Sequence, residues 1–214
     1  MHNRKSSRRD FIKYSLSAIL ALNFGCSIKG LLRDGQHKAA IIYGTKYGAT
    51  RDTAAWIKNG IGNNVDLLDV ETLDFEKAVS AYNYFIVGSG IWIDGVHRRL
   101  KDFLSSESVN MHKKVIAAFV VCGSRDTTEG GRKRIKRYLN QIHKPLGYKP
   151  ELSGYFGGRV IVEQLTEKDR EALIKFYRKF LKQELKSWDR TDQKKAVSFG
   201  KKLQHLVEAY SLNV

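Results

Sequence analysis

Cysteine and clustered histidine are scarce in this sequence, and their scarcity excludes several kinds of site. The two cysteines, Cys26 and Cys122, cannot supply a disulfide framework and do not form a CxxC pair. The six histidines are scattered through the 214 residues, without an HxxxH or HExxH pair on a predicted helix. We therefore predict neither a disulfide scaffold nor a metal site.

Long apolar runs, internal repeats and low-complexity tracts are absent as well. The apolar stretch at residues 14–24 is too short for a transmembrane helix, which needs about 20 apolar residues. The composition, 42% apolar and 28% charged, is that of a globular protein that buries a full core. The length suits one domain with some additions.

Acidic residues are few relative to basic ones, with 22 against 38 and a formal net charge of +16. Residues 1–25 hold five basic residues and one acid, a net of +4, which leaves +12 for the rest of the chain. A surface of this kind favours anionic partners, such as membrane headgroups, nucleic acid or acidic small molecules.

The N-terminus carries the pattern of an export signal. Residues 7–13 read SRRDFIK, which resembles the twin-arginine motif S-R-R-x-F-L-K, and the apolar stretch follows directly. We expect a signal or anchor segment at residues 1–27, a linker at 28–38 and one domain at 39–214. The expected route is the twin-arginine translocation machinery, which carries folded proteins to the periplasm or the outer face of the cytoplasmic membrane.

The sequence allows two fates for this signal segment after export. Cys26 follows Gly25, as in a lipoprotein cleavage site, whereas Asn23 and Phe24 do not fit that pattern. Lipidation at Cys26 is therefore one alternative. Because no A-x-A cleavage site is evident, an uncleaved anchor is the other.

The most informative segment is IIYGTKYGATRDTAAWI at residues 41–57. A buried apolar run ends in a loop of Thr and Gly, and a helix pattern begins at once, which is a favourable site for a phosphate. The loop is neither a Walker A sequence nor a GxGxxG fingerprint. It resembles the FMN-phosphate loop of flavodoxins at every position of that family's pattern. The matching residues are Ile41, Ile42, Tyr43, Gly44, Thr45, Lys46, Tyr47, Gly48, Ala49, Thr50 and Ala54.

The rest of the chain alternates between strand and helix patterns, which indicates a parallel sheet covered by helices on both faces. We expect strands at 39–43, 65–70, 84–88, 115–122 and within 152–162. Helices are expected at 50–61, 74–80, 96–104 and 130–142. The resemblance implies a flavodoxin-like three-layer α/β sandwich with strand order 2-1-3-4-5, and ligands then bind at the carboxyl ends of the strands.

Two helices are expected after the last strand. Residues 166–188 form one long helical pattern, with apolar positions from Leu173 to Trp188 on one side and basic flanks. This added helix could be a membrane contact, a substrate wall or a core helix, and we favour core packing with a basic outer face. A final helix is expected at about 191–210.

The resemblance assigns FMN as cofactor, held by the backbone N–H groups and hydroxyls of the phosphate loop. The cofactor-binding residues expected there are Thr45, Lys46, Tyr47, Gly48, Ala49 and Thr50. Lys46 and Arg51 would add positive charge beside the phosphate, and Gly48 would let the backbone approach it.

Two further loops would then flank the flavin ring. The cofactor-binding residues expected in the loop after the third strand are Ser89, Gly90, Ile91, Trp92 and Ile93. Trp92 would either stack on the ring or pack in the core. Those expected after the fourth strand are Gly123, Ser124, Arg125 and Asp126. Arg125 would be either a cation near the pyrimidine edge of the ring or a solvated loop residue. Cys122 is expected to be a buried small hydrophobe.

The densest charge is the basic helix at residues 132–137, RKRIKR. Such a run is usually a solvated face, and docking on anionic lipid is the alternative. No nucleic-acid recognition motif accompanies it, so we expect no nucleic-acid partner.

Within flavodoxin-like proteins, the chain most resembles menaquinone-dependent protoporphyrinogen IX dehydrogenases. The resemblance spans about residues 38–206 and includes the phosphate loop, the GSGIWIDG stretch at 88–95, the added helix and DRTD at 189–192. It implies an enzyme in which FMN carries the redox chemistry, without a catalytic side chain. The implied partners are a quinone or porphyrinogen-like molecule and an anionic membrane surface. A one-electron carrier and a non-catalytic flavodoxin-like binding module are the alternatives.

Overall fold

The computed structural model describes residues 38–63, 65–106 and 114–212. The expected signal segment, Cys26 and all of the expected linker except Lys38 lie outside these residues, so the export and lipidation predictions are not tested by the fold. Residues 37–214 form one compact unit. Over the range that is described, no helix is both long and apolar enough to cross a bilayer.

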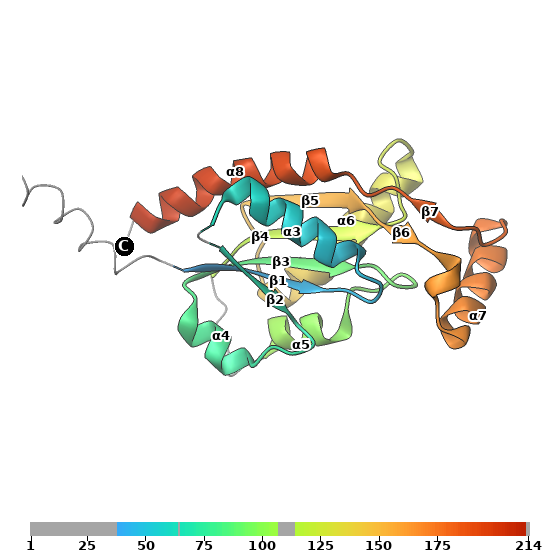
Figure 1. Cartoon of the computed structure of the whole chain (residues 1–214), viewed down its shortest axis with the longest axis horizontal. Helices are drawn as coiled ribbons and strands as arrows, with labels where there is room; N and C mark the ends of the chain where they lie inside the picture. The colour runs from blue at the N-terminus through green and yellow to red at the C-terminus, as the bar shows by residue number, and fades with distance from the viewer. Residues whose placement is uncertain (1–37, 64, 107–113, 213–214) are drawn as a thin grey trace, which may run out of the picture. The chain divides into compact units, whose positions relative to one another are not determined.

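Five parallel strands form the central sheet in the order β2-β1-β3-β4-β5, which confirms the predicted topology (Figure 1). The strands are β1 (Ala39–Gly44), β2 (Val65–Asp69), β3 (Tyr84–Gly90), β4 (Val115–Cys122) and β5 (Leu152–Gly157). Every residue of β1 and β4 is buried, as expected for strands that are covered on both faces.

Helices cover both faces of the sheet. The strand side chains on one face pack under α4 (Phe75–Ala81), α5 (Arg98–Ser105) and α6 (Glu129–Leu146). Those on the other face pack under α3 (Ala49–Ile61) and α8 (Gln193–Leu212), which lie side by side in Figure 1. Neighbouring residues of one strand point to opposite faces, so Ile41 contributes to the second core and Ile42 to the first. Each fully buried side chain of this size stabilises the fold by roughly 1.5–3 kcal/mol.

The segment between β5 and α8 differs from the single helix predicted at 166–188. After β6 (Arg159–Val160) and a 3-10 turn at Val162–Gln164, α7 runs only from Glu167 to Phe176. A π-helical turn, η2 (Tyr177–Leu181), follows and ends at Lys182, whose φ of 53° is left-handed. The chain then extends into β7 (Trp188–Asp189), which pairs antiparallel with β6.

The extra helix before α8 is thus confirmed as α7, but its predicted length and its predicted core packing are wrong. Of its expected apolar face only Leu173 is buried, whereas Phe180 and Leu181 are exposed. The helical periodicity is real up to Phe176. Beyond it, tertiary contacts override the helical pattern, because Trp188 is bound into the β6–β7 ribbon and its Nε1 donates to the hydroxyl of Tyr177 at 2.7 Å.

Candidate functional site

The three loops predicted to form one site do leave the sheet side by side. They follow β1, β3 and β4, which are adjacent in the sheet, with Gly44 beside Ser89 and Gly90 beside Val121. The sheet thus brings the carboxyl ends of these strands to one edge, where parallel α/β sheets bind ligands.

The loop after β1 is built around a left-handed glycine. Gly48 has a φ of 84°, a conformation that side chains disfavour, and its N–H donates to the Thr45 hydroxyl at 3.0 Å. Gly48 is also the N-cap of α3 and makes no side-chain cap. The first N–H groups of α3, from Ala49 onward, therefore have no acceptor within the helix and face the loop with the positive end of its dipole.

Cations gather at this helix N-terminus. A Cβ on Gly48 would lie 3.4 Å from a guanidinium nitrogen of Arg51 and 3.5 Å from one of Arg159. Two carboxylates counter them in part: Asp52 accepts from Arg159 at 2.6 Å, and Asp169 from Lys46 at 2.6 Å. Three cations against two carboxylates leave the loop electropositive, as an anion site requires.

Asp169 joins the segment between β5 and α8, which we call the added segment, to the phosphate loop. It lies in the first turn of α7, is buried, and binds Lys46 Nζ with one oxygen and the Tyr47 hydroxyl with the other. Thr166, the N-cap of α7, accepts from the Asp169 N–H at 3.3 Å. Burial alone would raise the pKa of the Asp169 carboxyl, but the hydrogen bonds from Lys46 and Tyr47 outweigh it and hold the pKa below its ordinary value.

Trp92 does not lie in the core, and its ring is in contact with the phosphate loop. It is half-buried and packs on the phosphate loop, with Lys46 Nζ 4.3 Å above its ring and the Tyr47 ring 5.6 Å away. A narrow recess of about 20 Å³ opens beside it. Its lining residues are Tyr47, Trp92, Arg159, Val160, Ile161, Gln164 and Leu165. Ligand pockets are usually several hundred Å³, so this recess is not the place of a flavin ring.

The remainder of the β3 loop makes a tight turn. Trp92 and Gly95 face each other, while Ile93 and Asp94 have φ values of 40° and 73°. A β-branched residue at positive φ is strained, yet Ile93 is 41% exposed. The basic helix secures the turn: Arg137 binds the Asp94 carboxylate, and Gln141 donates to the Asp94 carbonyl at 3.0 Å.

The β4 loop is held by arginines from two elements. Arg132 donates to the Asp126 carbonyl at 2.7 Å and Arg134 to the Ser124 hydroxyl at 3.2 Å, both from α6. Arg190 donates to the Gly123 carbonyl at 2.7 Å. Arg125 itself is exposed. The cations of the basic run on α6 are exposed, and several of them also hold the two glycine-rich loops.

Two other observations concern this loop. The Trp188 ring lies 3.2 Å from where a Cβ on Gly123 would be, so the added segment contacts the start of the loop. Burial, together with the nearby carboxylate of Asp126, raises the pKa of Tyr155 of β5 to about 12. Cys122 is buried as predicted, and burial raises the pKa of its thiol.

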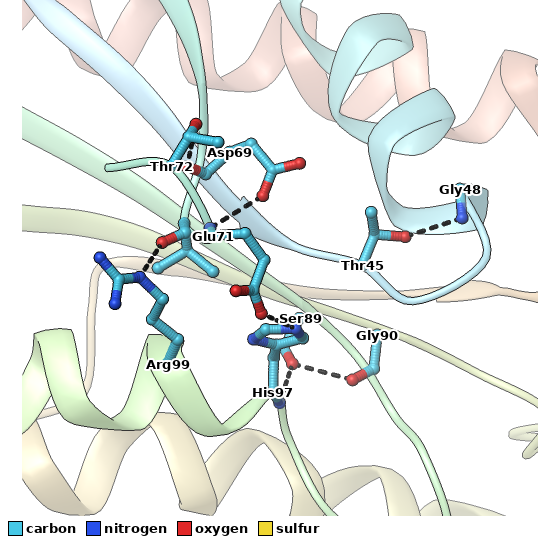
Figure 2. Close-up of polar contacts among 10 residues, drawn as sticks. Thr45, Gly48, Asp69, Glu71, Thr72, Ser89, Gly90, His97 and Arg99 are labelled. Atoms are coloured by element: carbon cyan, nitrogen blue, oxygen red, sulfur yellow. Dashed lines mark hydrogen bonds and ion pairs between the residues drawn. The ribbon is translucent and has the colours of Figure 1, made fainter. Parts of the chain in front are cut away.

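His97 is a residue of this edge that the sequence analysis missed. Figure 2 shows it beside Ser89, whose hydroxyl accepts from the His97 N–H at 2.8 Å, with Glu71 on the ring at 3.1 Å from Nε2. A Cβ on Gly44 would lie 2.5 Å from that of His97, so the phosphate loop begins in contact with this residue. Among the side chains that the structure describes, His97 Nδ1 is the one buried nitrogen or oxygen without a hydrogen-bond partner.

Other contributors were missed because nothing in the local sequence marks them. Asp169, Arg159 and Trp188 lie more than 100 residues after the phosphate loop. The T-x-x-D spacing of Thr166 and Asp169 indicates a helix start, but it does not indicate which loop the carboxylate contacts.

Comparisons with known proteins agree with this geometry. A family model described as a flavodoxin domain matches residues 40–187. No curated protein matches the sequence. Among solved structures, rubredoxin oxygen:oxidoreductase from Desulfovibrio gigas is similar, with 13% identity, a TM-score of 0.51, and coverage of 83% of this chain and 37% of that one.

Two further solved structures are similar to this chain. The Flv1 flavodiiron core from Synechocystis sp. PCC6803 has 15% identity and a TM-score of 0.50, covering 83% of this chain and 38% of that one. A flavodoxin from Archaea has 16% identity and a TM-score of 0.47, covering 80% of this chain and 99% of that one. The chain therefore spans less than half the length of the Desulfovibrio gigas and Synechocystis chains, and at these identities the likeness concerns the fold alone.

Proposed function

Because this chain belongs to the flavodoxin domain family, we propose that it is an FMN-dependent oxidoreductase that passes electrons between a small-molecule substrate and a membrane quinone. FMN is the cofactor of this domain. The finer assignment, to protoporphyrinogen or a similar donor, rests on the sequence resemblance to menaquinone-dependent protoporphyrinogen IX dehydrogenases. The export route and the membrane setting rest on the N-terminal sequence and the net charge.

The residues present fit the phosphate of FMN. The observation that carries the proposal is the uncapped N-terminus of α3, where Gly48 is left-handed and the guanidiniums of Arg51 and Arg159 converge. The Thr45 hydroxyl and the N–H groups of residues 46–50 would hold the phosphate. Lys46 and Arg159 each contribute less than an unpaired cation would, because Asp169 and Asp52 bind them at 2.6 Å.

The loops after β3 and β4 would flank the flavin ring. The turn at Trp92–Gly95 and the loop at residues 123–126 are each fixed by arginines, so the protein would present an ordered site rather than one formed on binding. Trp92 would flank the ring from the β3 loop, and exposed Arg125 would add positive charge from the β4 loop. When bound, FMN supplies the electron transfer, and the chain needs no acid–base side chain for it.

A reduction and reoxidation experiment tests this function. The FMN-loaded protein is reduced anaerobically, first chemically and then with a porphyrinogen, and a quinone analogue is added. Rapid reoxidation by the quinone is the expected result. The opposite result is a reduced protein that is not reoxidised by quinones but passes its electrons to a protein acceptor in two separate one-electron steps. That result would identify an electron carrier.

A further inference from the structure

Exposed large hydrophobic side chains are rare on the described part of this protein, and two of the three are consecutive. Phe180 is 64% exposed and Leu181 is 39% exposed, at the end of the π-helical turn η2. Turns of this kind occur frequently at functional sites. We call residues 175–182, which contain both side chains, the docking tip.

Local packing holds the docking tip together without burying it. The Phe176 and Phe180 rings lie 5.4 Å apart, and Lys179 Nζ lies 5.4 Å from the centre of the Phe180 ring. The left-handed Lys182 then ends the helix immediately after Leu181. Phe180 thus packs on its own segment and leaves its outer surface to solvent.

Positive charge surrounds this apolar pair. The exposed cations in and beside the docking tip are Lys175, Arg178, Lys179, Lys182 and Lys186. Between residues 175 and 186 the single acid is Glu184, for a net charge of +4. In the part of the chain that is described, none of these five cations forms an ion pair with a carboxylate.

We propose that the docking tip inserts Phe180 and Leu181 between the headgroups of an anionic membrane, while the surrounding lysines and arginine bind the lipid phosphates. Apolar and aromatic side chains rimmed by Lys and Arg are what interfacial membrane segments use, and cationic stems extend toward the headgroups. An anionic leaflet complements both the net charge of the tip and that of the whole chain.

The docking tip lies within a longer segment, residues 169–188, that also contacts the site, and this gives the docking a consequence. This longer segment begins at Asp169, on the phosphate loop, and ends at Trp188, on Gly123 of the β4 loop. In Figure 1, α7 stands beyond the carboxyl ends of the strands. This part of the inference rests on the proposed function: docking would bring the cofactor edge of the sheet to the surface that holds a lipid-soluble electron acceptor.

A site-specific label in the full chain tests the docking tip even if the N-terminal segment binds lipid by itself. Gln183→Cys, next to the tip, is labelled with an environment-sensitive dye in a Cys26→Ser background, where the remaining Cys122 is buried and unreactive. The control label is at Lys202→Cys, an exposed position on α8. Vesicles contain either phosphatidylglycerol with phosphatidylcholine or phosphatidylcholine alone.

The expected result is a blue shift of the label at residue 183 with anionic vesicles only, reduced at about 1 M salt because screening weakens headgroup binding. The label at 202 stays unchanged, and Phe180→Ser with Leu181→Ser abolishes the shift at 183. Equal responses at both positions, or none at 183, overturn the proposal. A shift that appears on concentrating the protein without lipid would assign the tip to a second copy of the chain, and also overturns it.

Failure of this proposal is separable from failure of the proposed function. Reoxidation of the reduced protein by a water-soluble quinone requires no vesicle. If that reaction is intact in the labelled Gln183→Cys protein, whose tip is unchanged, while its label shows no shift with anionic vesicles, the result counts against the docking tip alone.

Discussion

Asp169 is the residue that links the added segment to the phosphate loop most directly. It holds both Lys46 and Tyr47, so its loss would free two side chains of the loop that is expected to bind the phosphate. We predict that Asp169→Asn raises the dissociation constant for FMN about tenfold, the effect of losing about 1.4 kcal/mol, because loss of the ordered positions of Lys46 and Tyr47 outweighs the attraction that an unpaired Lys46, whose side chain is 44% exposed, adds for the phosphate. Quenching of FMN fluorescence measures it. Glu167→Gln, in the same turn but exposed, is the matched control, and equal affinity in both variants would refute the link.

The same carboxylate gives a pH dependence of defined sign. Its pKa in the folded protein lies below the ordinary value of 3.8, so its contribution to stability is present at neutral pH and is lost as the pH falls through the lowered pKa. The free energy of unfolding of the wild type should therefore decrease more than that of Asp169→Asn below about pH 4. Urea unfolding at several pH values measures the difference, and parallel curves would contradict it.

Ile93 offers a test of backbone strain. Its φ of 40° suits glycine, and relief of that strain should outweigh the loss of a side chain that is 41% exposed. Ile93→Gly is predicted to raise the free energy of unfolding by about 1 kcal/mol. Ile161→Gly is the control, because Ile161 has an ordinary φ of −112° and the same change there should destabilise. If both variants lose stability, Ile93 is not strained.

At the scale of elements, α8 approaches α3 more closely than side chains allow. A Cβ on Gly200 would lie 2.2 Å from the Ile57 carbonyl oxygen, and one on Gly60 would lie 2.2 Å from that of Val197. We predict that Gly200→Ala lowers the free energy of unfolding by about 1–3 kcal/mol. In the exposed helix position Gly130, where the nearest atom would be 3.7 Å away, the same change should be neutral or stabilising. Thermal melts compare the two variants.

Local pattern was sufficient for the sheet and for the loops that leave it. Strand 115–122 was predicted to the residue because its eight apolar residues are buried on both faces, and the motif at 41–54 located the turn from β1 into α3, where the phosphate is expected to bind. The segment at 166–188 was mispredicted because its structure depends on Asp169 reaching the phosphate loop and on Trp188 reaching Val160 and Gly123. Such long-range contacts leave no local periodicity in the sequence.

At the scale of the whole molecule, the cofactor should be part of the fold's stability. A ligand that binds only the folded chain stabilises it by about 2.7 kcal/mol at 100 times its dissociation constant. Removal of FMN should therefore lower the melting temperature, and added FMN should restore it in a concentration-dependent manner. A melting temperature that does not change when FMN is added would argue against a specific site.

The most direct test of the central claim compares FMN with riboflavin, which lacks the phosphate. The purified, flavin-free chain is titrated with each and followed by visible absorption and fluorescence. If the loop at residues 44–50 is a phosphate site, FMN binds with one molecule per chain and riboflavin binds at least about tenfold more weakly, a difference of about 1.4 kcal/mol. A chain that takes up no flavin, or that binds the two equally well, would contradict the account.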